Sequence, residues 1–370
     1  MPGVRVEAVT AQGAAAHERA WRDLGARALE PNVFAEPAFV LGALRHFRNT
    51  ARLELLLVWQ DQSADRLIGA IVLETPRAPP GFGVARAWRS EQAGLAALAL
   101  DREAGGQALD AIIDWLARER PRIIGLLTPA LDAAGPMAAL LETFAARQHA
   151  RRHRFGRRSR AILPAGRGFA RGFEASLPGK RLKEWRRQLR RLGERGAIAF
   201  RVASGEDAVE AFLALEARGW KGVQGAALRL DAGLAAFTRS MLAGLAREGR
   251  LASHLMELDG TPIAAGVVLR SEDRAFYWKT AYDEAYAAYS PGVQLTLELS
   301  RVQQRDATVA ATDSCAIEGH PMIERLWPAR VRLIDCVIAT RPGPARRIAL
   351  WIVAERAKRL INPLRGRRVT

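Results

Sequence analysis

The feature that most constrains the fold is a pair of similar hairpins, one in each half of the 370-residue chain. In the first half, a strand at 53–59 and a polar turn precede the apolar segment 67–73. In the second half, a strand at 252–258 and an Asp-Gly turn precede the apolar segment 263–269. Short apolar runs are typical of buried strands, and Asp-Gly favours a tight turn between antiparallel strands. The chain is therefore expected to build similar hairpins twice.

Helices surround both hairpins in the same order. Two helices precede each hairpin. A helix and a strand follow it, at 107–118 and 122–127 in the first half and at 293–304 and 308–315 in the second. A repeat of half the chain is too long for a solenoid, and helices inserted into a mostly antiparallel sheet indicate a mixed α/β domain used twice. We expect an N-terminal domain at 1–165, a C-terminal domain at 166–342 and a basic tail at 343–370.

Composition favours a folded cytoplasmic protein without a membrane span or a metal site. Hydrophobic residues make up 49% of the chain, which is enough for packed cores. No apolar run approaches the roughly 20 residues needed to cross a bilayer. The first residues lack the apolar segment of a signal peptide, so we expect a cytoplasmic protein. Cys315 and Cys336 have no metal-binding spacing, and we expect reduced, buried thiols and no metal site.

Basic residues are concentrated in three segments. The net charge is +17, and arginines gather in 151–171, 180–195 and 341–370. Such patches attract nucleic acid, anionic lipid or phosphorylated substrates, and a solvated face in an arginine-biased sequence is the alternative. An RNA- or anionic-membrane-binding protein without catalytic activity is therefore one candidate function. Aromatic residues are not interleaved with the arginines, and DNA is not expected as a partner.

Two of these basic segments are expected to form amphipathic helices. The apolar stripe within 180–195 consists of Leu182, Trp185, Leu189 and Leu192. This helix packs on one domain, forms a basic lip over a cleft that receives an anionic substrate, or does both. The tail helix places Leu350, Val353, Ala357 and Leu360 on one side. It can lie in an anionic membrane interface, although docking on the protein itself is preferred.

All four tyrosines lie between residues 277 and 289, which indicates either the wall of a cleft or an aromatic cluster that closes the core. Ser290 and Pro291 then suit the N-cap and first position of a helix. Free N–H groups and the positive dipole end favour phosphate or carboxylate there, although most helix starts bind nothing. Gly292 would let a ligand approach the backbone.

Two further groups of residues suit catalysis or binding. After the late strand, Asp313, Glu318 and His320 could supply a general base or orient an amine, while each alone is also ordinary as a cap or surface residue. Trp220 and Lys221 follow a helix end, where Lys221 either reaches into the cleft or complements the helix dipole. The sequence contains no serine-hydrolase motif of the G-x-S-x-G type.

Four segments, at 183–191, 216–222, 279–286 and 289–292, together resemble a known family. In order and spacing they are similar to the GNAT-fold acetyltransferase domain of the cellulose-biosynthesis type. That domain is related to the Fem-type aminoacyltransferases, which carry two GNAT-like domains in tandem. The first half matches in architecture only. The resemblance implies an α/β fold with two tandem GNAT-like domains, of which the first is degenerate.

The resemblance implies an N-acyltransferase that moves an acetyl, acyl or aminoacyl group from an activated thioester or ester to an amine. Together with the residues described above, it leads to three sets of site residues. The catalytic set is Lys279, Tyr282, Tyr289 and Asp313. The substrate-binding set is Trp220, Lys221, Asp283, Glu318 and His320. The donor phosphates are expected at Ser290, Gly292 and Val293.

The expected chemistry is direct attack by the amine, without a covalent enzyme intermediate. Backbone N–H groups near a splayed strand would bind the carbonyl oxygen, and a tyrosine or an acidic residue would manage protons. Acyl-CoA, in particular acetyl-CoA, is a candidate donor, and no permanently bound cofactor is expected. The expected partners are a small-molecule or carrier-bound acyl donor and an amine acceptor. Modification of envelope polysaccharide or lipid, and peripheral contact with the inner face of the membrane through 343–370, are further expectations.

Overall fold

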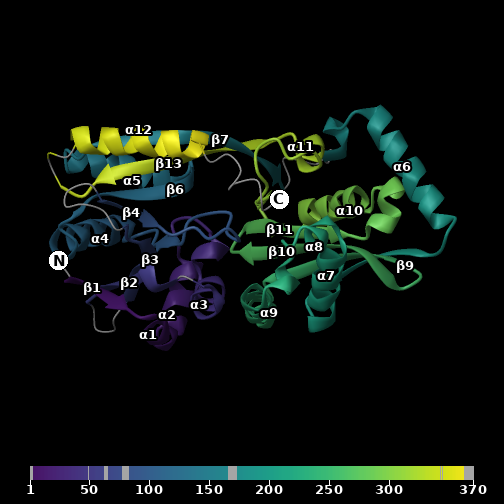
Figure 1. The fold of residues 1–370 in the computed structure, drawn as a ribbon, viewed down its shortest axis with the longest axis horizontal. Helices are drawn as coiled ribbons and strands as arrows, with labels where there is room; N and C mark the ends of the chain where they lie inside the picture. The colour runs from purple at the N-terminus through teal and green to yellow at the C-terminus, as the bar shows by residue number, and fades with distance from the viewer. Residues whose placement is uncertain are drawn as a thin grey trace. The chain divides into compact units, whose positions relative to one another are not determined.

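The computed structural model describes residues 3–48, 50–61, 66–76, 83–165, 173–341, 343 and 345–361. The chain forms two compact units. Unit 1 combines Met1–Ser159 with Arg332–Thr370, and unit 2 is Arg160–Val331. The expected C-terminal domain, 166–342, included the late strand that is counted with unit 1 from Arg332 onward. Figure 1 identifies the helices and strands named below.

Unit 1 contains a mixed sheet in the order β1-β2-β3-β4-β6-β13, with the short strand β5 paired to β3. Among the described strands of this order, all pairs are antiparallel except β4 with β6. The predicted first hairpin is confirmed as β2 and β3. The strands are β1 (Val4–Val9), β2 (Leu53–Gln60), β3 (Arg66–Glu74), β4 (Gly83–Ala87), β5 (Leu98–Leu100), β6 (Ile123–Asp132) and β13 (Arg330–Ala339).

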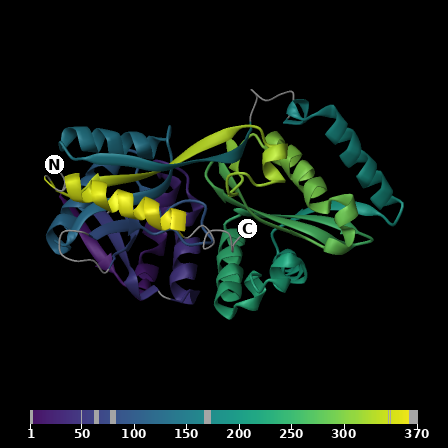
Figure 2. The same cartoon turned by 45° about the horizontal axis from the view of Figure 1, so that its top comes forward.

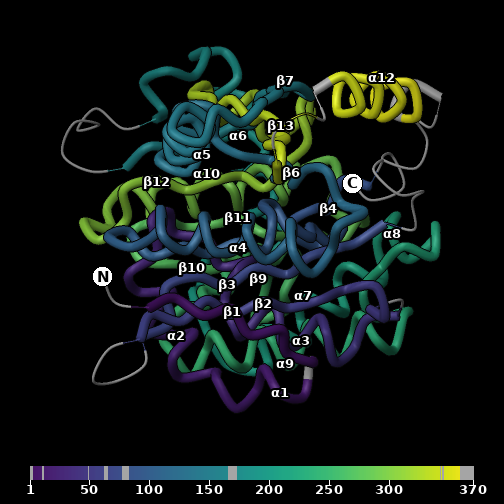
Figure 3. The backbone as a smooth tube through the Cα atoms, turned by 90° about the vertical axis from the view of Figure 1, so that its left-hand side faces the viewer, coloured from purple at the N-terminus to yellow at the C-terminus, as the bar shows by residue number. Residues whose placement is uncertain are grey.

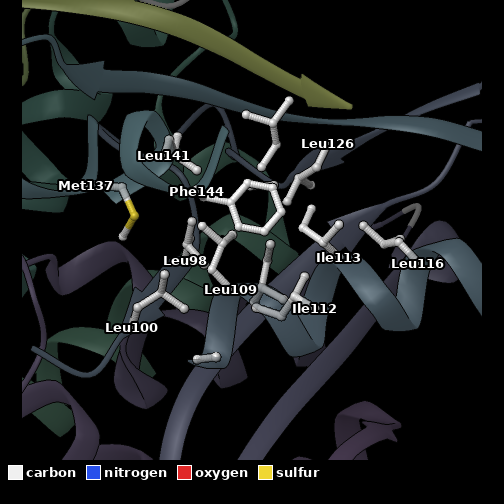
Figure 4. Packing of buried hydrophobic residues seen from close by; sticks show 14 of the residues in the cluster. Leu98, Leu100, Leu109, Ile112, Ile113, Leu116, Leu126, Met137, Leu141 and Phe144 are labelled. Carbon is white, nitrogen blue, oxygen red and sulfur yellow. The ribbon is translucent and has the colours of Figure 1, made fainter. Parts of the chain in front are cut away.

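Helices pack on both faces of the unit 1 sheet because successive strand residues point to opposite sides. Leu55 and Leu57 of β2 face α2 and α3, whereas Leu56 and Val58 face α4 and α5. Figure 4 shows the second of these clusters around Phe144. The helices are α1 (Ala11–Ala16), α2 (Glu18–Ala26), α3 (Pro37–His46), α4 (Gly105–Glu119) and α5 (Pro136–Arg147).

Unit 2 contains a second mixed sheet in the order β12-β11-β10-β9-β8, and the end of β7 pairs with β12. The only parallel pair among the described strands of this unit is β11 with β12. The predicted second hairpin is confirmed as β9 and β10. Its turn residues Asp259 and Gly260 both have positive φ, as a type I′ turn requires. The strands are β7 (Arg152–Pro164), β8 (Ile198–Ala203), β9 (Leu251–Leu258), β10 (Thr261–Ser271), β11 (Arg274–Tyr282) and β12 (Ala311–Asp313).

Two layers of helices cover the unit 2 sheet (Figures 1 and 2). Helices α6 and α10 lie on one side, here called the α10 face, and α7 and α9 lie on the other, the α7 face. The expected packing of the α6 stripe is confirmed, because Leu192 is fully buried and Leu182, Trp185 and Leu189 pack on the core. The elements are α6 (Gly179–Gly193), α7 (Glu206–Arg218), α8 (Trp220–Val223), α9 (Ala232–Arg247), the 3-10 helix η6 (Glu284–Tyr289), α10 (Pro291–Arg305) and α11 (Ile323–Leu326).

The predicted fold class is confirmed by this arrangement. In each unit, helices precede an antiparallel hairpin. After the hairpin, a long helix connects the two strands of one parallel pair: α4 lies between β4 and β6, and α10 between β11 and β12. None of the helices in the described part of the chain combines the length and hydropathy that a membrane span requires.

Candidate active site

Strands β11 and β12 separate shortly after they pair. Their parallel ladder joins Arg274–Phe276 to Ala311–Asp313 and ends there. Strand β12 stops at Asp313, whereas β11 continues to Tyr282. Beyond Phe276, β11 therefore has no β12 partner for the backbone groups on that side. Such groups are suited to hydrogen-bond a ligand carbonyl.

A β-bulge at Trp278 changes the direction of the side chains that follow it. In the pairing of β10 with β11, Val268 lies opposite Tyr277 and Val267 lies opposite Lys279. Residues directly opposite share a face, and consecutive residues such as Val267 and Val268 do not. Tyr277 and Val268 belong to the core on the α10 face, so Lys279 is directed to the α7 face. A bulge that re-aims a side chain is common beside functional sites.

On the α7 face, Lys279 lies near a buried ion pair. Lys221 Nζ is 2.9 Å from Glu216 Oε1, and the second carboxylate oxygen of Glu216 accepts a hydrogen bond from the backbone N–H of Leu228. Lys279 is half-buried, and no ion pair of its ammonium is found within the described chain. Burial, aided by the positive charge of Lys221, lowers the pKa of Lys279 to about 8, against the opposing effects of Glu216 and Cys315.

The loop after β12 is held by a second buried ion pair. Arg160 of β7 lies 3.2 Å from the Asp313 carboxylate, and both side chains are buried. Asp313 also accepts a hydrogen bond from the backbone N–H of Cys315, whose φ of 53° is left-handed. Asp313 is thus engaged in fixing the turn that follows β12. Burial and the charge of Asp313 raise the pKa of the Cys315 thiol well above its usual range.

His320 caps the short helix α11 from the same loop. Its Nδ1 accepts from the backbone N–H groups of Met322 and Ile323, at 3.3 and 3.4 Å. In the neutral ring the proton is therefore on Nε2. Burial, with a smaller contribution from Lys221, lowers the pKa of His320. Glu318 is exposed in the same loop.

The four tyrosines occupy two kinds of environment. Tyr277 is buried in the core, and its hydroxyl lies 3.1 Å from Thr296 Oγ1. The other three are half-buried. Tyr282 lies opposite Ala264, which places it on the α10 face. The guanidinium of Arg195 lies over both Tyr286 and Tyr289, at 5.6 and 5.8 Å from the ring centroids. The expected grouping of Lys279 with Tyr282 is therefore divided between the two faces of the sheet.

The start of α10 is more enclosed than the sequence indicated. Ser290 is the N-cap, as predicted, and it has a left-handed φ of 52°. Its carbonyl accepts from the N–H groups of Val293 and Gln294, so two amides of the first turn are already used. Gly292 is buried, and a Cβ there would lie 3.4 Å from the ring of Tyr282. The Tyr282 ring therefore lies against the side of Gly292 from which a side chain would project.

Short polar contacts connect α8 to η6. The backbone N–H of Trp220 donates to Glu284 Oε1 at 2.6 Å, and Asp283 caps η6 by accepting from Ala285. The Trp220 side chain is 39% exposed. These contacts bring α8, with Trp220 and Lys221, to the end of β11. Within the described chain, no group of His, Cys, Asp and Glu side chains is arranged to hold a metal ion.

Residues 179–306 match the acetyltransferase (GNAT) domain family. The matched region runs from the first residue of α6 to the residue after α10 and therefore includes Lys221, Lys279 and Ser290. No curated protein matches the chain.

Several solved structures share the fold over most of the chain. FemX is 10% identical with a TM-score of 0.55, covering 90% of this chain and 96% of its own. A conserved protein of unknown function from Bacteroides thetaiotaomicron is 12% identical with a TM-score of 0.53, covering 91% and 99%. The C-terminal domain of a putative lysylphosphatidylglycerol synthetase from Agrobacterium fabrum is 12% identical with a TM-score of 0.51, covering 91% and 94%. The TM-scores and the coverage show a shared fold that extends beyond residues 179–306 into unit 1. At identities this low, the likeness shows the fold alone.

Sequence reasoning missed four contributors to the candidate site in unit 2. They are the bulge at Trp278, the carboxylate of Glu216, the guanidinium of Arg160 and the stacking of Arg195 on two tyrosines. Glu216 had a visible signal, since an acidic residue five positions before Lys221 on a helix end can fold back to it. The bulge and the Arg160 contact depend on strands far apart in the sequence and have no local signal.

Proposed function

We propose that the GNAT domain of unit 2 transfers an acyl group from an activated thioester or ester to an amine, at the point where β11 separates from β12. The observation that carries this proposal is the three-residue ladder followed at once by the bulge that directs Lys279 to the α7 face. An unpaired strand segment beside an ammonium of lowered pKa offers both hydrogen-bond donors for a carbonyl oxygen and a group that can take up a proton.

In the proposed reaction the amine attacks the acyl carbon directly. A C–N bond forms, and the C–S or C–O bond to the leaving group breaks. Backbone N–H groups of β11 beyond Phe276 bind the carbonyl oxygen as negative charge develops. Cys315 supports direct attack, because the raised pKa of its thiol leaves little thiolate to act as a competing nucleophile.

Lys279 is the proposed proton acceptor. An amine must lose a proton to attack or during attack, and a lysine with a pKa of about 8 is half deprotonated, and so able to act as a base, at about pH 8. Lys221, which is paired with Glu216, helps to keep the pKa of Lys279 low. Tyr282 and Tyr289, on the side of η6 and α10, are proposed to return a proton to the leaving group through water.

The proposed donor is an acyl-CoA such as acetyl-CoA or an aminoacyl ester. The acceptor is proposed to be an amine on an envelope polysaccharide or lipid, as in the cellulose-biosynthesis type that the sequence resembles. Trp220, Asp283, Glu318 and His320 remain proposed contacts for the substrates, and Ser290, Gly292 and Val293 remain proposed contacts for the donor phosphates.

Unit 1 is proposed to be the degenerate member of the pair. The turn just before its long helix α4 holds a carboxylate of the protein: Asp101 is fully buried and accepts from the N–H groups of Glu103 and Ala104. Arg27 and Arg66 lie 3.3 and 2.9 Å from the same carboxylate. The polar groups just before α4 are therefore already paired within the protein.

A donor screen tests the proposed function. Thermal shift with a panel of acyl-CoAs and aminoacyl esters identifies a donor, and mass spectrometry of amine acceptors measures transfer. We expect Lys279→Met to lower the transfer rate by at least about 100-fold, the usual contribution of a general base. Arg247→Met, at an exposed position at the end of α9, serves as the control and should leave the rate unchanged. Stabilisation by no donor, or equal rates for both variants, would contradict the proposal.

A further inference from the structure

Helix α12 (Ala345–Ile361) is attached to unit 1 by one of its sides. Ile348 and Ile352 are buried in a cluster with Phe155 and Val337. The ring of Trp351 lies edge-on to Phe155, and Glu355 pairs with Arg86 at 3.0 Å. The inward side of α12 thus packs on unit 1, as predicted by the interpretation that the tail docks on the protein itself.

The outward side of α12 is also apolar. Leu350 and Val353 are each 63% exposed, and they are the two large apolar side chains of this helix found on the surface among its described residues. Ala354 and Ala357 are exposed as well, and the spacing 350, 353, 354, 357 places all four on one face of a helix. Figures 1 and 3 show α12 at the outer edge of unit 1. A helix with apolar residues on two opposite sides has one more apolar side than its docking requires.

Basic residues border this outward stripe. Arg346 and Arg356 are exposed in α12, as is Lys358. The segment 341–370 contains nine lysines and arginines and a single acid, Glu355, whose carboxylate is paired with Arg86. The outward side therefore combines an apolar centre with an uncompensated positive border.

We propose that the outward side of α12 binds the surface of an anionic lipid bilayer. The helix lies in the plane of the interface, with Leu350 and Val353 among the headgroups and the upper acyl chains and the basic border on lipid phosphates. A second copy of this chain is a poorer occupant, because its own basic border would face this one. RNA is also a poorer occupant, because the centre of the stripe is aliphatic and has no aromatic platform for bases.

Vesicle flotation of the full chain tests this surface. The probes are vesicles of phosphatidylcholine alone and of phosphatidylcholine mixed with phosphatidylglycerol. We expect binding to the anionic vesicles only, and weaker binding as salt is raised, because salt screens the phosphate contacts. Leu350→Gln combined with Val353→Gln should reduce the bound fraction by about tenfold, since two exposed apolar side chains lose their burial in lipid. Arg346→Gln combined with Arg356→Gln should also reduce the bound fraction. This reduction should be larger at low salt than at high salt, because salt already screens the phosphate contacts.

Substitutions are preferable to removal of α12, because removal would expose the cluster that Ile348 and Ile352 cover. Leu230→Gln is the matched control, since Leu230 is 57% exposed on unit 2 and should not affect binding. Unchanged thermal melting confirms that each variant is folded. Absence of binding, equal binding to both kinds of vesicle, or equal effects of Leu230→Gln and Leu350→Gln would overturn the proposal. So would a dimer in solution that the Leu350 and Val353 substitutions dissociate.

Discussion

Tyr277 and Lys279 are two residues apart on β11, yet their side chains lie on opposite faces of the unit 2 sheet. Regular alternation would place them together. The bulge at Trp278 separates them, so that Tyr277 completes the core against Thr296 while Lys279 joins the Glu216–Lys221 pair. One inserted residue thus converts a core strand into a strand that serves both the core and a polar site.

The titration of Lys279 is the first prediction. The chain has five lysines, so a protein labelled at lysine side chains should show five assignable resonances by NMR. We expect Lys279 to titrate near pH 8 because of its burial. The folded pKa lies below the unfolded one, so the unfolded state binds more protons between these values, and stability rises as pH increases from about 8 towards 10.5. Lys279→Met should abolish this rise in urea unfolding experiments, whereas Lys358→Met should retain it.

Removal of the Glu216 charge is the second prediction. Glu216 raises the pKa of Lys279, so Glu216→Gln should lower that pKa further and shift the rise in acyl-transfer rate to lower pH. The glutamine can still accept from Leu228, which limits the structural damage. The same NMR titration measures the shift, with Glu194→Gln in an exposed position as the control. A Lys279 pKa that moves upward would contradict the assigned geometry.

Asp313 and Arg160 provide the third prediction. Removing one partner of a buried ion pair leaves an uncompensated charge and costs about 3–5 kcal/mol, whereas an apolar replacement of both costs much less. We expect Asp313→Leu to destabilise unit 2 strongly, and Asp313→Leu with Arg160→Met to recover part of the loss. Denaturant unfolding of the two single variants and the double variant measures the coupling. Full additivity of the single effects would show that the pair does not hold the Cys315 turn.

His254 provides the fourth prediction. Its side chain is 3% exposed on the α10 face, opposite Gly266, and burial lowers its pKa to about 4. Because the unfolded histidine takes up a proton near its ordinary pKa and the folded one does not, stability should fall as pH decreases from about 6.5 to 4. A single proton accounts for at most about 1.4 kcal/mol per pH unit. His254→Leu should flatten the unfolding free energy over this range, and His46→Leu, at a partly exposed position, should not.

Much of the fold was predictable from local patterns. The hairpins, the helices that flank them and the N-cap at Ser290 follow from periodicity and turn chemistry, which act over a few residues. The face of Lys279 was not predictable, because a bulge depends on the partner strand. The engagement of Asp313 with Arg160 likewise depends on the approach of β7, 153 positions away in sequence. The residue types at the site could therefore be predicted from the sequence. Their division between the α7 face and the α10 face of the unit 2 sheet could not.

The return of β13 to unit 1 has a consequence for the order of folding during synthesis. Strand β6 receives its antiparallel neighbour only when Leu333–Ala339 has emerged from the ribosome. At about 5–20 residues per second, this delay after β6 is made is roughly 10 to 40 seconds. During that interval β6 presents an open edge, the kind of surface that recruits chaperones or foreign strands. The sheet of unit 1 is therefore complete only after the whole of unit 2 has been translated.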